Sequence, residues 1–155
     1  TAAWGGIRGA PWVPTRRRDV ARALGLAEPR AGDCVMDVGC GSGGILAAFA
    51  AHGCRVRGWE LALLPWTITR WRLRRYADAR VTYGDFWNAS CADADIVYAF
   101  LMPKVLARLG TKLQRELRPG ARVITYVWPI PGWIPERVDR VADAPPFYRY
   151  RITRT

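Results

Sequence analysis

The glycine-rich segment from Asp37 to Gly44 (DVGCGSGG) carries the strongest chemical signal in the sequence. Gly39, Gly41 and Gly44 fit the loose pattern GxGxxG, which lets the backbone approach a bound nucleotide closely. That pattern alone is weak evidence, because NAD-binding and FAD-binding proteins share it. Asp37 narrows the choice of ligand. An acid two residues before the first glycine disfavours the pyrophosphate of a dinucleotide and suits a cationic amino group.

Two further acids stand where later strands are expected to end. Glu60 can accept hydrogen bonds from both hydroxyls of a ribose, because a carboxylate offers two acceptor oxygens. Asp85 can accept from the exocyclic amine of adenine, while Phe86 or a neighbouring apolar residue packs against the ring. Each acid also has a structural interpretation, as a helix cap for Glu60 and a turn residue for Asp85. Together with the glycine loop, the three acids predict a site for S-adenosylmethionine, which has an amino group and no phosphate.

The elements that position these residues alternate along the chain. Apolar runs predict strands at residues 34–38, 55–60, 80–85, 95–101 and 122–128, and two further strand-like segments at 137–142 and 147–152. Helical patterns fall at 15–26 with Thr15 as N-cap, 45–52, 64–77, and 103–118. Five βα units followed by a hairpin predict an α/β, Rossmann-like doubly wound sheet, mostly parallel with a C-terminal antiparallel hairpin. Such sheets bind ligands at the carboxyl ends of their strands.

The composition favours one folded domain with a basic surface. The chain has 155 residues, 50% of them hydrophobic, which suits a single domain with a substantial core. Lys and Arg total 24 against 13 for Asp and Glu, and the net charge of +11 points to an acidic partner: nucleic acid, anionic lipid or protein. Four cysteines without a CxxC pair, and a single histidine, predict no metal site and a reducing compartment.

Short motifs along the chain resemble those of one enzyme family. They are Ala10–Thr15 (APWVPT), Asp37–Gly43 (DVGCGSG), Gly84–Trp87 (GDFW), Phe100–Pro103 (FLMP), Leu113–Val123 (LQRELRPGARV) and Trp128–Trp133 (WPIPGW). Their order resembles the class I, or seven-β-strand, S-adenosylmethionine-dependent methyltransferases. Within that class they are most similar to the mitochondrial lysine methyltransferases that modify the ATP synthase c-subunit and the adenine nucleotide translocase, with their short bacterial and archaeal relatives.

The resemblance implies a protein-lysine N-methyltransferase that acts on a membrane-associated protein. It further implies S-adenosylmethionine as cofactor and S-adenosylhomocysteine as product. The chain departs from the family at Ser42 and Gly44, where the family has an acid and an arginine, and at Ala62 and Leu63, where it has Asn-Pro. These departures bear on the substrate more than on the cofactor. An RNA or small-molecule methyltransferase and a non-catalytic nucleotide-binding module stay open as alternatives.

The expected cofactor contacts combine the glycine loop, the acids and their neighbours. They are Thr15, Asp37, Gly39, Cys40, Gly41, Glu60, Leu61, Asp85, Phe86 and Phe100. Candidates for a substrate channel are aromatic, because aromatic faces hold an amine by cation–π contact, although core packing is the alternative for each. They are Trp87, Tyr98, Phe100, Tyr126 and Trp128. We assign no catalytic base, since a lysine nucleophile needs only to arrive neutral.

The N-terminal residues and the positive charge together indicate a location for the protein. Residues 1–14 are expected to be an N-terminal segment, for which a plain terminus and a remnant following a membrane anchor, as the resemblance implies, are the alternatives, and residues 15–155 the methyltransferase domain. Arginines cluster at 16–18 and again at 70–75, although the second group spreads around its expected helix. We expect a cytoplasmic protein at the inner face of an anionic membrane, and nucleic acid is the weaker alternative.

Overall fold

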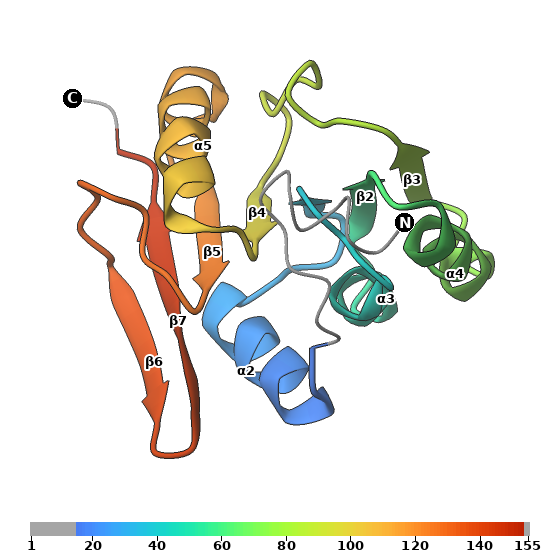
Figure 1. Ribbon diagram of the computed structural model, residues 1–155, viewed down its shortest axis with the longest axis horizontal. Helices are drawn as coiled ribbons and strands as arrows, with labels where there is room; N and C mark the ends of the chain where they lie inside the picture. The colour runs from blue at the N-terminus through green and yellow to red at the C-terminus, as the bar shows by residue number, and fades with distance from the viewer. Residues whose placement is uncertain (1–14, 154–155) are drawn as a thin grey trace.

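The computed structural model describes residues 15–153, and its centre is a seven-stranded sheet (Figure 1). The strands are β1 (Cys34–Asp37), β2 (Arg55–Glu60), β3 (Ala79–Tyr83), β4 (Ile96–Ala99), β5 (Arg122–Tyr126), β6 (Arg137–Val141) and β7 (Ala144–Arg151). The helices are α2 (Arg17–Ala27), α3 (Gly44–Ala51), α4 (Leu63–Leu73) and α5 (Pro103–Glu116). The expectations for residues 1–14, including most of the APWVPT motif, lie outside the described residues.

The sheet order β3-β2-β1-β4-β5-β7-β6 confirms the predicted fold class. The first five strands pair in parallel, while β7 is antiparallel to both β5 and β6. The chain builds outward from β1 to β3 in one direction and then from β4 to β5 in the other. The order therefore reverses between β1 and β4, where an open α/β sheet forms its ligand crevice.

Helices cover the two faces of the sheet unequally. Helices α2, α3 and α4 lie together on one face, and α5 lies alone on the other (Figure 1). The α5 core contains Leu106, Leu109 and Leu113, packed on alternate residues of the central strands. The opposite core contains Phe49 of α3 and Leu73 of α4. The sheet thus separates two apolar layers, as its period-two alternation requires.

Three local predictions from the sequence are wrong. Residues 84–95, between β3 and β4, form a loop without a helix, so five βα units do not occur. In that loop Asp85 and Ser90 each accept a hydrogen bond from the backbone two residues on, which competes with helix formation. Helix α4 ends at Leu73, because its last turn tightens into bonds to carbonyls three residues back. Arg16 rather than Thr15 occupies the N-cap of α2, and its side chain makes no capping bond.

Arginines join the C-terminal hairpin and β5 to the rest of the fold. Arg22 of α2 bonds Asp139 of β6 at 2.7 Å, and the buried Arg149 of β7 donates to the carbonyl of Leu26 at 2.9 Å. Arg122 of β5 pairs with Asp33 at 2.7 Å. Much of the positive charge of the chain therefore stabilises the fold. Among the described residues, no helix is long and apolar enough to cross a bilayer.

Two helical glycines give a test of the packing of α5. A β-carbon at Gly110 would lie 2.9 Å from Cγ2 of Ile130 and 3.2 Å from Nε1 of Trp133, whereas one at Gly25 of α2 meets nothing within 4 Å. We expect Gly25→Ala to raise the free energy of unfolding by up to ~1 kcal/mol through helix propensity. Gly110→Ala should lose that gain and lower stability by about 1–3 kcal/mol through overpacking. Urea unfolding measures both, and equal gains would contradict this packing.

Candidate functional site

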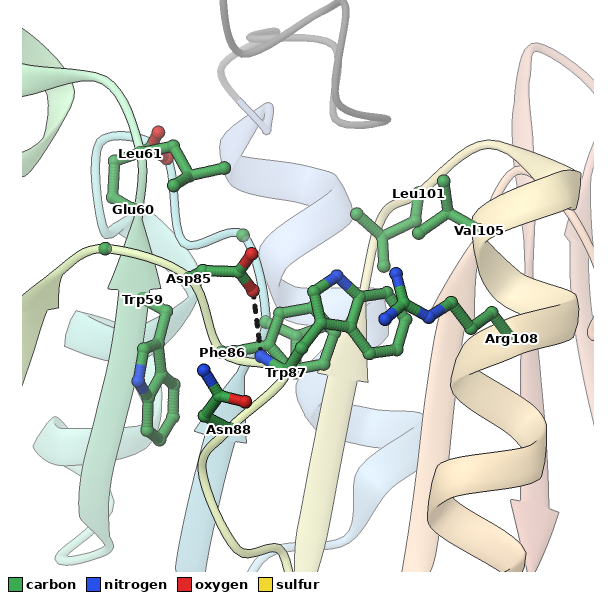
Figure 2. Close-up of a pocket in the computed structure, with 13 residues that line it drawn as sticks. Trp59, Glu60, Leu61, Asp85, Phe86, Trp87, Asn88, Leu101, Val105 and Arg108 are labelled. Atoms are coloured by element: carbon green, nitrogen blue, oxygen red, sulfur yellow. Dashed lines mark hydrogen bonds between the residues drawn. The ribbon is translucent and has the colours of Figure 1, made fainter.

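A cavity of about 460 Å³ lies at the carboxyl ends of β1, β2 and β3, beside the start of α5 (Figure 2). Its walls come from the segment after each strand and from the first turns of α5. They are Val38, Gly39, Trp59, Glu60, Leu61, Gly84, Asp85, Phe86, Trp87, Asn88, Leu101, Val105 and Arg108. The volume is in the range of small-molecule sites, and the position is the one that the sheet topology predicts.

Glu60 ties the glycine loop to the following helix. One carboxylate oxygen accepts from the Gly41 N–H at 2.9 Å, and the other accepts from the Ala62 N–H at 2.8 Å. Thr69 of α4 strengthens the tie by donating to the Gly41 carbonyl at 2.7 Å. The interpretation of Glu60 as a cap therefore holds, because Ala62 is the N-cap residue of α4. Each carboxylate oxygen keeps a second lone pair that can accept from a ligand.

Asp37 is a buried carboxyl at the tip of β1, behind the cavity wall. It is 2% exposed and accepts a hydrogen bond from the Gly39 N–H at 3.2 Å. Burial, together with the charge of Glu60, raises the pKa of Asp37 to about 7, although the backbone hydrogen bond from Gly39 acts in the opposite direction. A cation that reached this carboxyl would stabilise its ionised form, so the position favours an ammonium group.

The loop after β3 brings an acid and two aromatic rings to the cavity. Asp85 is exposed and accepts from the Trp87 N–H at 2.9 Å, so its interpretation as a turn residue also holds. The rings of Phe86 and Trp87 lie 4.4 Å apart. Figure 2 shows Arg108 reaching from α5 over Trp87, with its guanidinium 3.9 Å from the ring centroid. Sequence reasoning missed Arg108, although its spacing of three from Val105 places both on one face of α5.

The other aromatic candidates form a separate group near the ends of β4 and β5. Phe100 lies 5.0 Å from Tyr126 and 6.1 Å from Trp128 between ring centroids. Phe100 and Tyr126 line a hollow of about 270 Å³, and the Tyr126 hydroxyl donates to Asp19 at 3.2 Å. Tyr98 instead lies in the core against α2 and α3.

Val127 has a strained backbone at the tip of β5. Its φ of 73° lies in the left-handed region, where a β-branched residue is rare. The Trp128 N–H donates to the Tyr126 carbonyl at 3.0 Å, which makes a γ-turn centred on Val127. The Thr125 hydroxyl donates to the Trp128 carbonyl at 2.8 Å and fixes the residue that follows the turn. Backbone strain of this kind concentrates at functional sites, and here it orients Trp128 toward Phe100.

The ten expected cofactor residues do not all lie in the cavity. Gly39, Glu60, Leu61, Asp85 and Phe86 line the cavity. Asp37 and Gly41 lie behind its wall, joined by hydrogen bonds to Gly39 and Glu60 respectively. The Cys40 sulfur points into the sheet toward Gly58, and Thr15 and Phe100 line two other hollows. All four cysteines are buried and free.

Comparison with known proteins gives one consistent family. The model of the ANTKMT methyltransferase domain matches residues 37–137, which include every wall residue of the cavity. The chain is 40% identical over 144 residues to the adenine nucleotide translocase lysine N-methyltransferase of Mus musculus, covering 84% of this chain and 61% of that protein. It is 33% identical over 133 residues to the ATP synthase c-subunit lysine N-methyltransferase of Xenopus laevis, covering 83% and 58%.

A shorter relative and a solved structure match over most of both chains. The protein-lysine N-methyltransferase of Saccharolobus islandicus is 31% identical over 140 residues, which are 86% of each chain. The crystal structure of an RNA methyltransferase from Salinibacter ruber with S-adenosyl-L-homocysteine has a TM-score of 0.84 at 28% identity, covering 90% of this chain and 94% of that one. The chain spans only 58% and 61% of the length of the two animal relatives.

The buried carboxyl of Asp37 predicts a pH dependence of stability. Its folded pKa of about 7 lies above the ordinary value of 3.8, so the folded state binds the proton more tightly. Stability is therefore greatest below pH ~4 on account of this group, and falls by as much as ~4 kcal/mol as the pH rises to about 7. We expect Asp37→Asn to remove this loss. Chemical unfolding of both proteins across that pH range measures it, and parallel curves would contradict it.

The strained turn predicts unequal effects of two valine substitutions. Val127→Gly should change the free energy of unfolding little or raise it, because glycine adopts a positive φ without the ~1–3 kcal/mol cost of strain. The matched control is Val123→Gly in β5, which removes a fully buried side chain and should cost at least ~2 kcal/mol. Thermal and urea unfolding compare the two. A loss at Val127 as large as that at Val123 would show that its backbone is unstrained.

Proposed function

Because the chain belongs to the ANTKMT methyltransferase domain family, we propose that it is an S-adenosylmethionine-dependent protein-lysine N-methyltransferase. The observation that carries this proposal is the cavity where Gly39, Glu60 and Asp85 meet at the ends of three parallel strands. The proposed substrate is a lysine of a membrane-associated protein, since the animal relatives are named for the ATP synthase c-subunit and the adenine nucleotide translocase. The proposed location is the cytoplasmic face of a membrane.

The donor and acceptor groups of the cavity fit S-adenosylmethionine. Glu60 and Asp85 present carboxylate oxygens that suit hydroxyl and amine donors, as a ribose and an adenine provide. Leu61, Phe86 and Leu101 supply apolar surface for a base. The cofactor is also supported by the Salinibacter ruber relative, whose structure contains S-adenosyl-L-homocysteine.

When bound, S-adenosylmethionine supplies an electrophilic methyl group on a positively charged sulfur. The role of the protein is to bind the cofactor and the substrate and to orient them toward each other. Glu60 would hold the ribose, Asp85 the adenine amine, and Asp37 the amino group, directly or through water. Because the pKa of Asp37 is about 7, its carboxyl is only partly ionised at neutral pH, and an arriving ammonium would favour the carboxylate form. Glu60 also fixes the position of the glycine loop, because its hydrogen bonds to the N–H groups of Gly41 and Ala62 form without a ligand.

On the substrate side, Phe100 and Trp128 would bind the target amine. Their rings are nearly parallel, at 21°, and their faces attract an ammonium before its deprotonation and a methylated ammonium afterwards. The lysine must lose its proton to water or to its surroundings before it attacks, and a desolvated site lowers its pKa. Tyr126 would form part of the wall of the site rather than act as a base, because its hydroxyl already donates a hydrogen bond to Asp19.

An RNA methyltransferase is the second candidate. The Salinibacter ruber protein, which matches over 94% of its length, is named for RNA, and a net charge of +11 suits a polyanion. Incubation with tritiated S-adenosylmethionine and separate membrane-protein, soluble-protein and RNA fractions distinguishes the two. Label in a membrane protein, recovered as methyl-lysine after hydrolysis, is the expected result, and label in RNA alone would overturn the lysine proposal.

The proposed cofactor contacts predict a loss of affinity. Asp37→Ala and Glu60→Ala should each weaken binding of S-adenosylhomocysteine by at least about tenfold, because each removes a hydrogen bond to or from a charged group. Titration calorimetry measures the affinity, with circular dichroism to show that the variants fold. Asp78→Ala, an exposed acid outside the cavity, is the matched control. Unchanged affinity in the Asp37 or Glu60 variant would refute the contact assigned to it.

A further inference from the structure

We propose that the outer face of α4 docks the protein on the surface of an anionic lipid bilayer. This α4 face consists of the exposed residues Leu63, Leu64, Thr67, Arg70, Trp71 and Arg74. Their spacing places all six within about a third of the helix circumference, since each residue turns an α-helix by ~100°. The opposite side of the helix, with Thr69 and Leu73, is buried against the sheet.

The α4 face exposes large apolar side chains that folding alone does not require. Leu63 is 52% exposed, Leu64 62% and Trp71 66%. Tyr83 of the neighbouring β3 is 54% exposed, and its ring lies 5.5 Å from that of Trp66 on α4. Several exposed large apolar side chains gathered on one helix and the neighbouring strand favour an interaction site, whereas single exposed residues do not.

The charge around this face has one sign. Residues 61–77 contain four arginines and no Asp or Glu. Among the described residues, no ion pair involves these arginines, in contrast to Arg22, Arg122 and Arg149, which hold the fold together. Uncompensated positive charge beside exposed apolar residues is complementary to a surface that is anionic outside and apolar beneath.

Aromatic contacts shape these side chains for a lipid interface. The Arg74 guanidinium lies 4.1 Å from the ring centroid of Trp71, and that of Arg70 lies 5.0 Å from Trp66. A tryptophan under an arginine can lie at the level of the headgroups while the guanidinium contacts phosphate. The two leucines favour lipid over RNA, because aliphatic side chains offer no π face on which a base can stack.

The α4 face begins beside the cavity. Glu60 and Leu61 line the cavity, and α4 starts two residues later with the exposed Leu63 and Leu64. Figure 1 shows α4 at the edge of the fold next to β3, with the β6–β7 hairpin at the opposite edge. Docking through α4 would thus hold the cavity close to the membrane surface. This last step rests on the proposed function, whereas lipid binding itself does not.

Vesicle sedimentation tests the docking. The full chain should bind vesicles of equal parts phosphatidylcholine and phosphatidylglycerol, and bind vesicles of phosphatidylcholine alone far more weakly. Arg70→Gln with Arg74→Gln should weaken binding to the anionic vesicles by about fivefold per arginine. Leu64→Ser with Trp71→Ser should weaken it at least as much. The matched controls, Arg140→Gln and Ile134→Ser, alter an exposed arginine and the 92% exposed Ile134 outside the α4 face, and should change nothing.

Two further measurements separate docking from the other possibilities. Brominated phosphatidylcholine in the anionic vesicles should quench the protein less when Trp71→Phe is introduced, since that residue would enter the interface. All variants should keep their affinity for S-adenosylhomocysteine, so a failure of the proposed function would leave the vesicle result intact. Equal vesicle binding by the α4 and control variants would overturn the proposal. The proposal would also be overturned if the α4 variants kept their binding to vesicles and lost only binding to single-stranded RNA or self-association.

Discussion

The bidentate role of the Glu60 carboxylate is the interaction on which the rest of the site depends. It accepts from Gly41 in the loop after β1 and from Ala62 at the start of α4, and so joins two segments that different strands deliver. A parallel sheet places both segments at one edge but does not set their distance. With this carboxylate in place, the glycine loop closes one wall of the cavity and α4 leaves the sheet in a fixed direction.

Burial makes the neighbouring acid behave differently. Asp37 accepts a backbone hydrogen bond from Gly39, and burial raises its pKa to about 7, so that an approaching cation would favour its ionised form. The Glu60 carboxylate accepts hydrogen bonds from two backbone N–H groups and forms part of the cavity wall. The two carboxyls at adjacent strand tips therefore have different roles. Glu60 fixes the backbone of the glycine loop, and Asp37 can respond to the charge of a ligand by a change of ionisation. Their difference arises from burial and hydrogen bonding, because the residue types are chemically alike.

The positive charge of the chain also serves two purposes. Arg122 and Arg149 are nearly buried and pair with acids or carbonyls of distant segments, so they belong to the fold. The arginines of α4 lie outside every ion pair of residues 15–153 and stand beside exposed apolar side chains. A net charge of +11 is therefore a poor guide to a partner by itself. The unpaired part of it, and its apolar neighbours, carry the information.

Local sequence was sufficient for the strands, the parallel sheet with its final hairpin, and the three acids at strand tips. Apolar runs and glycine punctuation are short-range signals, and the β2 boundaries follow from them directly. The expected number of βα units was too high, because residues 84–95 form a loop in which the Asp85 and Ser90 side chains accept backbone hydrogen bonds. Arg108 over Trp87, the γ-turn at Val127 and the outward face of α4 required the tertiary structure. They depend on which distant segments meet and which face stays uncovered, and no periodicity within a single segment encodes that.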